Sequence, residues 1–143
     1  MRWSIGVALA VLIGVSAARV QAQNPAAAVS PIKPIATVVE IMKIMTIPFS
    51  NAVFEAGGDA PKDDKSWEMV RGQAVALAEA GNLLMLGTRA KDHAAWMKFS
   101  RAQVDAAEAA AKAAAAKNAD QLSAASDALY ETCSGCHKVY MAK

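Results

Sequence analysis

The chain has 143 residues, of which 55% are hydrophobic and 20% are charged, and only two cysteines and two histidines. Removing Arg2 and Arg19 with the signal peptide predicted below lowers the 15 basic residues to 13, against 13 acidic ones. The mature chain is then formally neutral, so no excess of basic residues indicates binding to nucleic acid or to an anionic membrane. Its length is enough for one hydrophobic core and not for two.

The first 22 residues have the pattern of a secretory signal peptide. A short basic start is followed by an apolar run from Ile5 to Ala18 and by small residues before a cleavage site after about Ala22. The run of 14 residues is shorter than the 20 or so that a membrane span needs, which argues against an uncleaved anchor. We therefore expect a periplasmic protein with no membrane span after cleavage, and a proline-containing linker over residues 23–34.

The first predicted helix begins at a capping box formed by Thr37 and Glu40 and ends at the glycines and proline of residues 57–61. Pro48 lies inside this helix. Because Pro48 has no N–H to donate to the carbonyl of Ile44, a kink or a local break is expected there.

Three further helices follow. The second is predicted from about Trp67 to Leu86, with Gly87 as its stop and Gly81 inside it. The third runs from about Asp92 to Lys117, and its alanine-rich second half predicts a thin, closely packed helix because alanine is the strongest helix former.

The fourth helix begins after an N-cap at Asn118 and ends with the sequence Cys133-Ser134-Gly135-Cys136-His137. C-x-x-C-H is the attachment motif for c-type haem. Two thiols three positions apart can each form a thioether to a porphyrin vinyl group, and the adjacent histidine then lies under the iron as its axial ligand. The motif therefore predicts one covalently attached haem c, held by Cys133, Cys136 and His137.

A redox pair, a zinc site and a structural disulfide are less consistent with these five residues. A thioredoxin-like redox pair would follow a strand, and no strand-like alternation precedes Cys133. A structural zinc site would need all four cysteines and histidines of the chain to converge. A disulfide between Cys133 and Cys136 would leave His137 unexplained.

The element order predicts an all-α fold, an up-down-up-down four-helix bundle over residues 35–143 with the haem at one end. In this topology the end of the fourth helix lies beside the start of the first, the end of the second and the start of the third. These segments contain the bulky apolar residues, so this end is predicted to be wide and to hold the haem. Gly81 is explained equally well by a close helix crossing or by room for the porphyrin.

Met42 is the best candidate for the sixth iron ligand, because its height on the first helix matches that of His137 on the antiparallel fourth helix. Met45 lies one turn deeper on the same face, and Met85 is at the same end. The alternative is that all three methionines fill the core. His93, the other imidazole, is expected to face solvent at the start of the third helix.

The chain resembles the class II c-type cytochromes, which are the cytochromes c′ and their low-spin His/Met relatives. The resemblance rests on CSGCHKVY, with Tyr140 three residues after the histidine, and on EIMKIMT, and covers about residues 35–143. It implies that Met42 occupies the distal position, where low-spin members have their methionine ligand. In the cytochromes c′ an apolar residue leaves a five-coordinate iron that binds nitric oxide or carbon monoxide. The resemblance to this family also implies that a homodimer through the first two helices is possible.

Two departures favour the His/Met members. Many cytochromes c′ have an arginine after the aromatic residue that follows the histidine, where this chain has Met141. Many also have an arginine four residues before the distal position, where this chain has Val38.

We therefore expect a periplasmic monohaem cytochrome that exchanges single electrons with redox partner proteins of the periplasm, since methionine raises the iron potential. A five-coordinate haem protein that binds nitric oxide or carbon monoxide is the alternative. An enzyme such as a peroxidase is not expected, because it needs distal acid–base groups and the helix near Met42 offers only hydrocarbon and Lys43.

Overall fold

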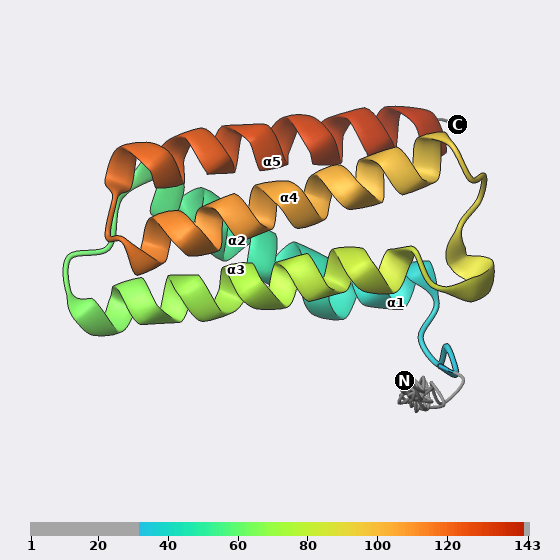
Figure 1. Cartoon of the computed structure of the whole chain (residues 1–143), viewed down its shortest axis with the longest axis horizontal. Helices are drawn as coiled ribbons and strands as arrows, with labels where there is room; N and C mark the ends of the chain where they lie inside the picture. Colours follow the sequence, from blue (N-terminus) through green and yellow to red (C-terminus); the bar gives the residue numbers. More distant parts are fainter. Residues whose placement is uncertain (1–31, 142–143) are drawn as a thin grey trace, which may run out of the picture. The chain divides into compact units, whose positions relative to one another are not determined.

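The computed structural model describes residues 32–141, so the predicted signal peptide (1–22) and most of the predicted linker (23–34) lie outside the described residues. Within residues 32–141 the structure is helical and has no strand (Figure 1). Its elements are α1 (Val38–Ile41), η1 (Met42–Thr46), α2 (Ile47–Gly58), α3 (Asp64–Leu84), η2 (Gly87–Arg89), α4 (Ala95–Ala115) and α5 (Ala119–Tyr140). Because α1, η1 and α2 follow one another without a gap, they form one helix, and four helices pack against one another. The all-α prediction is confirmed.

The first helix changes its neighbours along its length. Its α2 part packs against both α5 and α3, whereas α1 and η1 make their main contacts with α3. Figure 1 shows α2 near α5 and α1 beside the end of α3. The first helix, which contains Met42, is therefore in close contact with α5 along its α2 part. Toward α1 the distance between the two helices increases.

Side-chain caps set several helix ends. The capping box is present as predicted, because the Glu40 N–H donates to Thr37 Oγ1 over 3.2 Å and Glu40 Oε2 accepts from the Thr37 N–H over 2.7 Å. Asn118 caps α5 as predicted, with its Oδ1 accepting from the Gln121 N–H over 3.0 Å. These caps satisfy N–H groups that have no partner within the helix.

Four predicted boundaries were wrong by two or three residues, among them the end of α4, which lies at Ala115 and not near Lys117. Helix α3 begins at Asp64, before the predicted Trp67, because Asp63 caps it. It ends at Leu84, before the predicted Leu86, and the chain then turns through Gly87 with a φ of +58°. Helix α4 begins at Ala95 after the N-cap residue Ala94, and the carboxylate of Asp92 accepts from the Ala95 N–H over 2.8 Å.

The local break predicted near Pro48 takes the form of a π-helical segment, η1, directly upstream. The Ile47 N–H donates to the carbonyl of Met42, five residues back, where an α-helix would pair residues four apart. We attribute the wider turn to Pro48, which offers no N–H to the carbonyls before it. The segment contains both Met42 and Met45.

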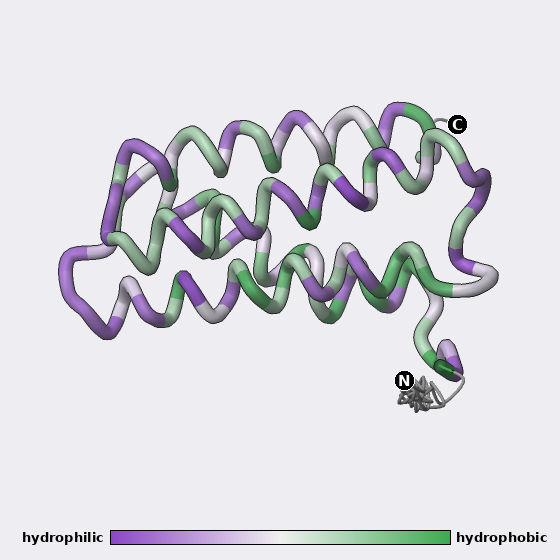
Figure 2. The backbone as a smooth tube through the Cα atoms, viewed as in Figure 1, coloured by the Kyte–Doolittle hydropathy of each residue, from purple (hydrophilic) through white to green (hydrophobic). Residues whose placement is uncertain are grey.

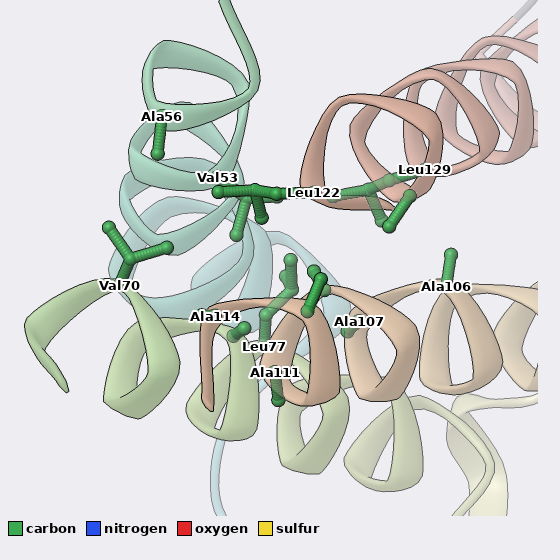
Figure 3. Packing of buried hydrophobic residues seen from close by; sticks show 14 of the residues in the cluster. Val53, Ala56, Val70, Leu77, Ala106, Ala107, Ala111, Ala114, Leu122 and Leu129 are labelled. Carbon is green, nitrogen blue, oxygen red and sulfur yellow. The ribbon is translucent and has the colours of Figure 1, made fainter. Parts of the chain in front are cut away.

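The buried side chains form two hydrophobic clusters. Hydrophobic and hydrophilic residues alternate along the helices (Figure 2), and buried hydrophobic residues of the four helices form the two clusters. The large cluster includes the alanines of α4 together with Leu77 of α3, Val53 of α2 and Leu129 of α5 (Figure 3). The small cluster consists of Ile41, Ala80, Leu84 and Trp96. The buried alanines of α4 are at most 8% exposed, so the closely packed helix predicted from the alanine run is confirmed.

Gly81 lies at a close crossing of α3 and α4. A Cβ atom at this position would lie 2.7 Å from Val104 Cγ2 and 3.2 Å from the carbonyl oxygen of Ser100. The sequence left a helix crossing and room for the porphyrin as equal possibilities, and the structure supports the helix crossing.

Gly81→Ala is expected to destabilise the protein by about 1–3 kcal/mol, because a backbone oxygen cannot yield as a flexible side chain can. Gly72, in the same helix, has no atom within 4 Å of the added Cβ. Gly72→Ala should therefore stabilise the fold by about 0.4–1 kcal/mol through the unfolded state. Urea unfolding of both variants measures the difference, and equal stabilisation by both would contradict the close crossing.

Candidate functional site

The C-x-x-C-H motif occupies the last turns of α5. Cys133 and Cys136 are three residues apart on this helix, so their side chains share a face. Both are half-buried free thiols, and His137 is exposed. The two sulfurs and the imidazole thus lie within little more than one helical turn, as the attachment of one porphyrin requires.

The thiols are not in a setting that activates cysteine as a redox nucleophile. Burial raises the pKa of the Cys133 thiol, with a smaller contribution from Cys136, and burial also raises the pKa of Cys136. A thioredoxin-type cysteine needs its pKa lowered. The raised pKa values and the helix before the motif both argue against the redox-pair alternative.

The motif spans the boundary between the two hydrophobic clusters. Cys133 packs against the large cluster, and Tyr140 packs against the small one. Between them, a Cβ added at Gly135 would lie 3.0 Å from the Phe99 ring. The turns of α5 that contain the motif therefore pack against aromatic and aliphatic side chains.

Met42 and Met45 lie on the small-cluster side of this boundary, as Tyr140 does. Both are half-buried and pack against the small cluster, whereas Phe49, one turn later, packs against the large cluster. The structure thus gathers the candidate methionines and Tyr140, three residues beyond His137, around one set of buried residues. A soft thioether on one helix and an imidazole on another are ligands that haem iron takes.

The other candidates lie at the edge of this region. Met85 is half-buried at the C-terminal end of α3. His93 is exposed in the turn before α4, as the sequence predicted. Trp96 is buried, and its Nε1–H donates to the carbonyl of Leu84 over 2.8 Å, which fixes the end of α3 to the start of α4.

Asp92 and Tyr140 form a contact that no pattern in the sequence indicates. The Tyr140 hydroxyl donates to the Asp92 carboxylate, which also accepts from the N–H groups of Ala95 and Trp96. The hydrogen bond from Tyr140 is the main cause that lowers the pKa of Asp92. Burial and that hydrogen bond raise the pKa of Tyr140 to about 12. The Tyr140 ring packs edge-on against Trp96, with centroids 4.9 Å apart. The end of α5 is thus held against the start of α4.

The lowered pKa of Asp92 predicts a pH-dependent contribution to stability. The contribution is present above the ordinary carboxyl pKa of 3.8 and is lost as the pH falls through the lower folded value. Asp92→Asn keeps an oxygen that can accept from the Ala95 N–H but cannot ionise, so it should be less stable than wild type at pH 6, and the difference should be smaller at pH 2.5. Urea unfolding at both pH values measures this, and a constant difference would contradict the role of the charge.

Arg89 is a second feature that the sequence did not reveal. Its side chain is buried, and it donates from Nε and Nη2 to the carbonyl of Ala36 over 2.9 and 2.8 Å and from Nη1 to that of Leu83 over 3.1 Å. It links the segment before α1 to the C-terminal end of α3, where a cation is favourable. The start of the helix with Met42 is thereby fixed to α3.

Thr46 has a buried Oγ1 with no hydrogen-bond partner among the described residues. It is the last residue of η1, next to Met45, and buried hydroxyls nearly always have a partner. Helix α5 thus contributes two thiols and an imidazole, and η1 contributes two thioethers that pack against the same small cluster as Tyr140. This donor set fits a haem c group.

Comparison of the chain with models of protein families, with curated proteins and with solved structures finds no match. Within residues 32–141, no three histidine, cysteine, aspartate or glutamate side chains are grouped so as to hold a metal ion. No helix in the same part of the chain combines the length and the hydrophobicity that crossing a membrane requires.

Proposed function

We propose that the chain is an exported monohaem c-type cytochrome that transfers single electrons. The observation that supports this most is the C-x-x-C-H motif on the last turns of α5, with half-buried thiols, and with Met42 packed against the small cluster that Tyr140 also contacts. In this proposal the four helices are an up-down-up-down bundle with haem c at the end that contains α1. The protein is periplasmic, is not an enzyme, and resembles the low-spin members of the class II cytochromes.

The residues have separate roles. Cys133 and Cys136 would hold the porphyrin through thioethers, and His137 would ligate the iron. Met42 would be the second protein ligand and would close the site to small molecules. Haem supplies a reversible one-electron change at iron. The protein contributes a rigid setting, because Arg89 fixes the start of the helix with Met42 and Asp92 fixes the end of α5 through Tyr140. The two clusters exclude water, and a thioether ligand in an apolar site raises the potential.

Redox proteins of the periplasm are the proposed partners, since an electron carrier needs a donor and an acceptor. A closed six-coordinate site suits this role because its geometry changes little between the two oxidation states. With Met42 unbound, the same fold would present an open coordination position. It would then act as the gas-binding alternative.

The visible absorption spectrum of the purified protein tests the proposal. The ferrous protein is expected to be low-spin and to bind carbon monoxide slowly, because the gas must first displace Met42. A high-spin spectrum with immediate carbon monoxide binding would make the gas-binding alternative the better candidate. A purified protein without a haem spectrum would overturn both.

A further inference from the structure

The charged residues of the helical unit are segregated along its length, although the mature chain is formally neutral. We call the end that contains α1, η1, η2, the start of α4 and residues 133–140 of α5 the motif end. Its contacts define it, because Asp92 bonds Tyr140, Arg89 bonds Ala36, and Pro34 lies against Gly87. Five exposed lysines belong to these segments: Lys33, Lys43, Lys91, Lys98 and Lys138.

Few carboxylates oppose these lysines. The segments of the motif end contain Glu40 and Asp92, and both already accept hydrogen bonds, Glu40 in the capping box and Asp92 from Tyr140. The four ion pairs within residues 32–141 all lie in the other half of the unit: Lys62–Asp59, Arg71–Glu68, Lys112–Glu108 and Lys117–Asp64. The lysines of the motif end thus have no carboxylate partner among the described residues.

The other half of the unit is acidic. Besides its paired carboxylates it contains seven more exposed acidic side chains: Glu55, Asp63, Glu79, Asp105, Asp120, Asp127 and Glu131. The mature chain is formally neutral, but its net charge does not show how the fold distributes the charges along the unit. The two propionates of a haem would offset only part of the five lysine charges.

Exposed apolar side chains lie among these lysines. Val139 is 55% and Met141 69% exposed, directly after Lys138 and His137. An apolar centre with a charged rim is the composition of a transient protein–protein interface. Charged rims accelerate the encounter with a complementary surface and orient it.

We propose that the motif end docks onto an acidic protein surface that surrounds the redox centre of the partner. This rests on the proposed function, since the lysines belong to the end of the unit that contains the haem-attachment motif. Attraction between opposite charges would orient the cytochrome with His137 and the exposed apolar residues toward the partner. The acidic half would point away and would be repelled from the same surface.

Two charge-reversal variants with equal net charge test whether the docking surface lies at the motif end. Lys98→Glu with Lys138→Glu changes the motif end, and Lys62→Glu with Lys65→Glu makes the same change in net charge at the opposite end. The oxidation of the haem-loaded ferrous protein by ferricyanide, an anion, is measured by stopped flow at low salt. The motif-end pair should lower the rate about tenfold, whereas the opposite pair should change it less than twofold. In wild type the rate should fall as salt rises, because the screening length shrinks to about 3 Å at 1 M.

Failure of this inference and failure of the proposed function are distinguishable. Absence of covalent haem overturns the proposed function before any rate is measured. A haem-loaded protein whose rates are independent of salt, or are lowered equally by the two variant pairs, overturns only the docking surface.

Binding measured without electron transfer separates the kinds of partner. In an NMR titration with a polyglutamate peptide, amide shifts should concentrate at Lys43, Lys91, Lys98 and Lys138 and spare the region of Lys62 and Lys65. Shifts at both ends alike would overturn the proposal. Cosedimentation with phosphatidylglycerol vesicles in 0.15 M salt, a concentration with a screening length of about 8 Å, would also overturn it. The surface would then bind lipid.

Discussion

Haem should no longer migrate with the polypeptide on denaturing gels when Cys133 and Cys136 are both replaced by alanine. The two thioethers are the only covalent links that the chain can offer, since it has no other cysteine. The loss should be complete, with no haem staining above background for protein exported to the periplasm alongside the haem-attachment machinery. His137→Ala should leave the thiols in place but damage attachment or change the spin state.

Ser134→Ala is the matched control. Ser134 lies between the two cysteines and is half-buried like them, but it has no part in attachment. This variant should stain like wild type. Staining of the double cysteine variant, or haem that acid-acetone extracts from wild type, would show that the group is not held through Cys133 and Cys136.

Met42→Ala is expected to have the second largest effect. Removing the thioether opens the iron, so the spectrum of the purified protein should become high-spin and exogenous ligands such as carbon monoxide should bind at once. The reduction potential should fall, because methionine ligation raises it. Absorption spectra and potentiometric titration of wild type and variant measure both changes.

Met45→Ala is the matched control for Met42→Ala. Both methionines are half-buried in η1 and pack against the small cluster. Met45→Ala should keep the low-spin spectrum and lower the free energy of unfolding by less than the roughly 2–5 kcal/mol lost at fully buried sites. A high-spin spectrum in Met45→Ala together with a low-spin spectrum in Met42→Ala would exchange the two assignments.

Local chemistry made much of the fold predictable. The caps at Thr37 and Asn118 are short-range hydrogen bonds within three residues, and the alanine run needs only helix propensity and small size. Pro48 predicted a local break because its missing N–H is a property of one residue. The form of that break, a π-helical segment ending in the unpaired Thr46, depends on packing and could not be foreseen.

Contacts between distant residues account for what the sequence did not show. Arg89 bonds a carbonyl 53 positions away, and Tyr140 bonds Asp92 across 48 positions. Neither pair has a spacing pattern, since each exists only after the helices have packed. Gly81 is similar. A glycine inside a helix could be noticed in the sequence, but the atom that leaves no room for a side chain there, the carbonyl oxygen of Ser100, lies on another helix. The candidate site was predictable because C-x-x-C-H is contiguous.

The intact mass of the exported protein under denaturing conditions tests the central claim most directly. Denaturation removes every group that is held by packing or by axial ligands alone, so only covalent haem stays with the polypeptide. The expected mass is that of the mature chain plus one haem, and the mass of the Cys133→Ala, Cys136→Ala variant should be that of the chain without it. A wild-type protein with the mass of the bare polypeptide would contradict the proposal that this chain is a c-type cytochrome.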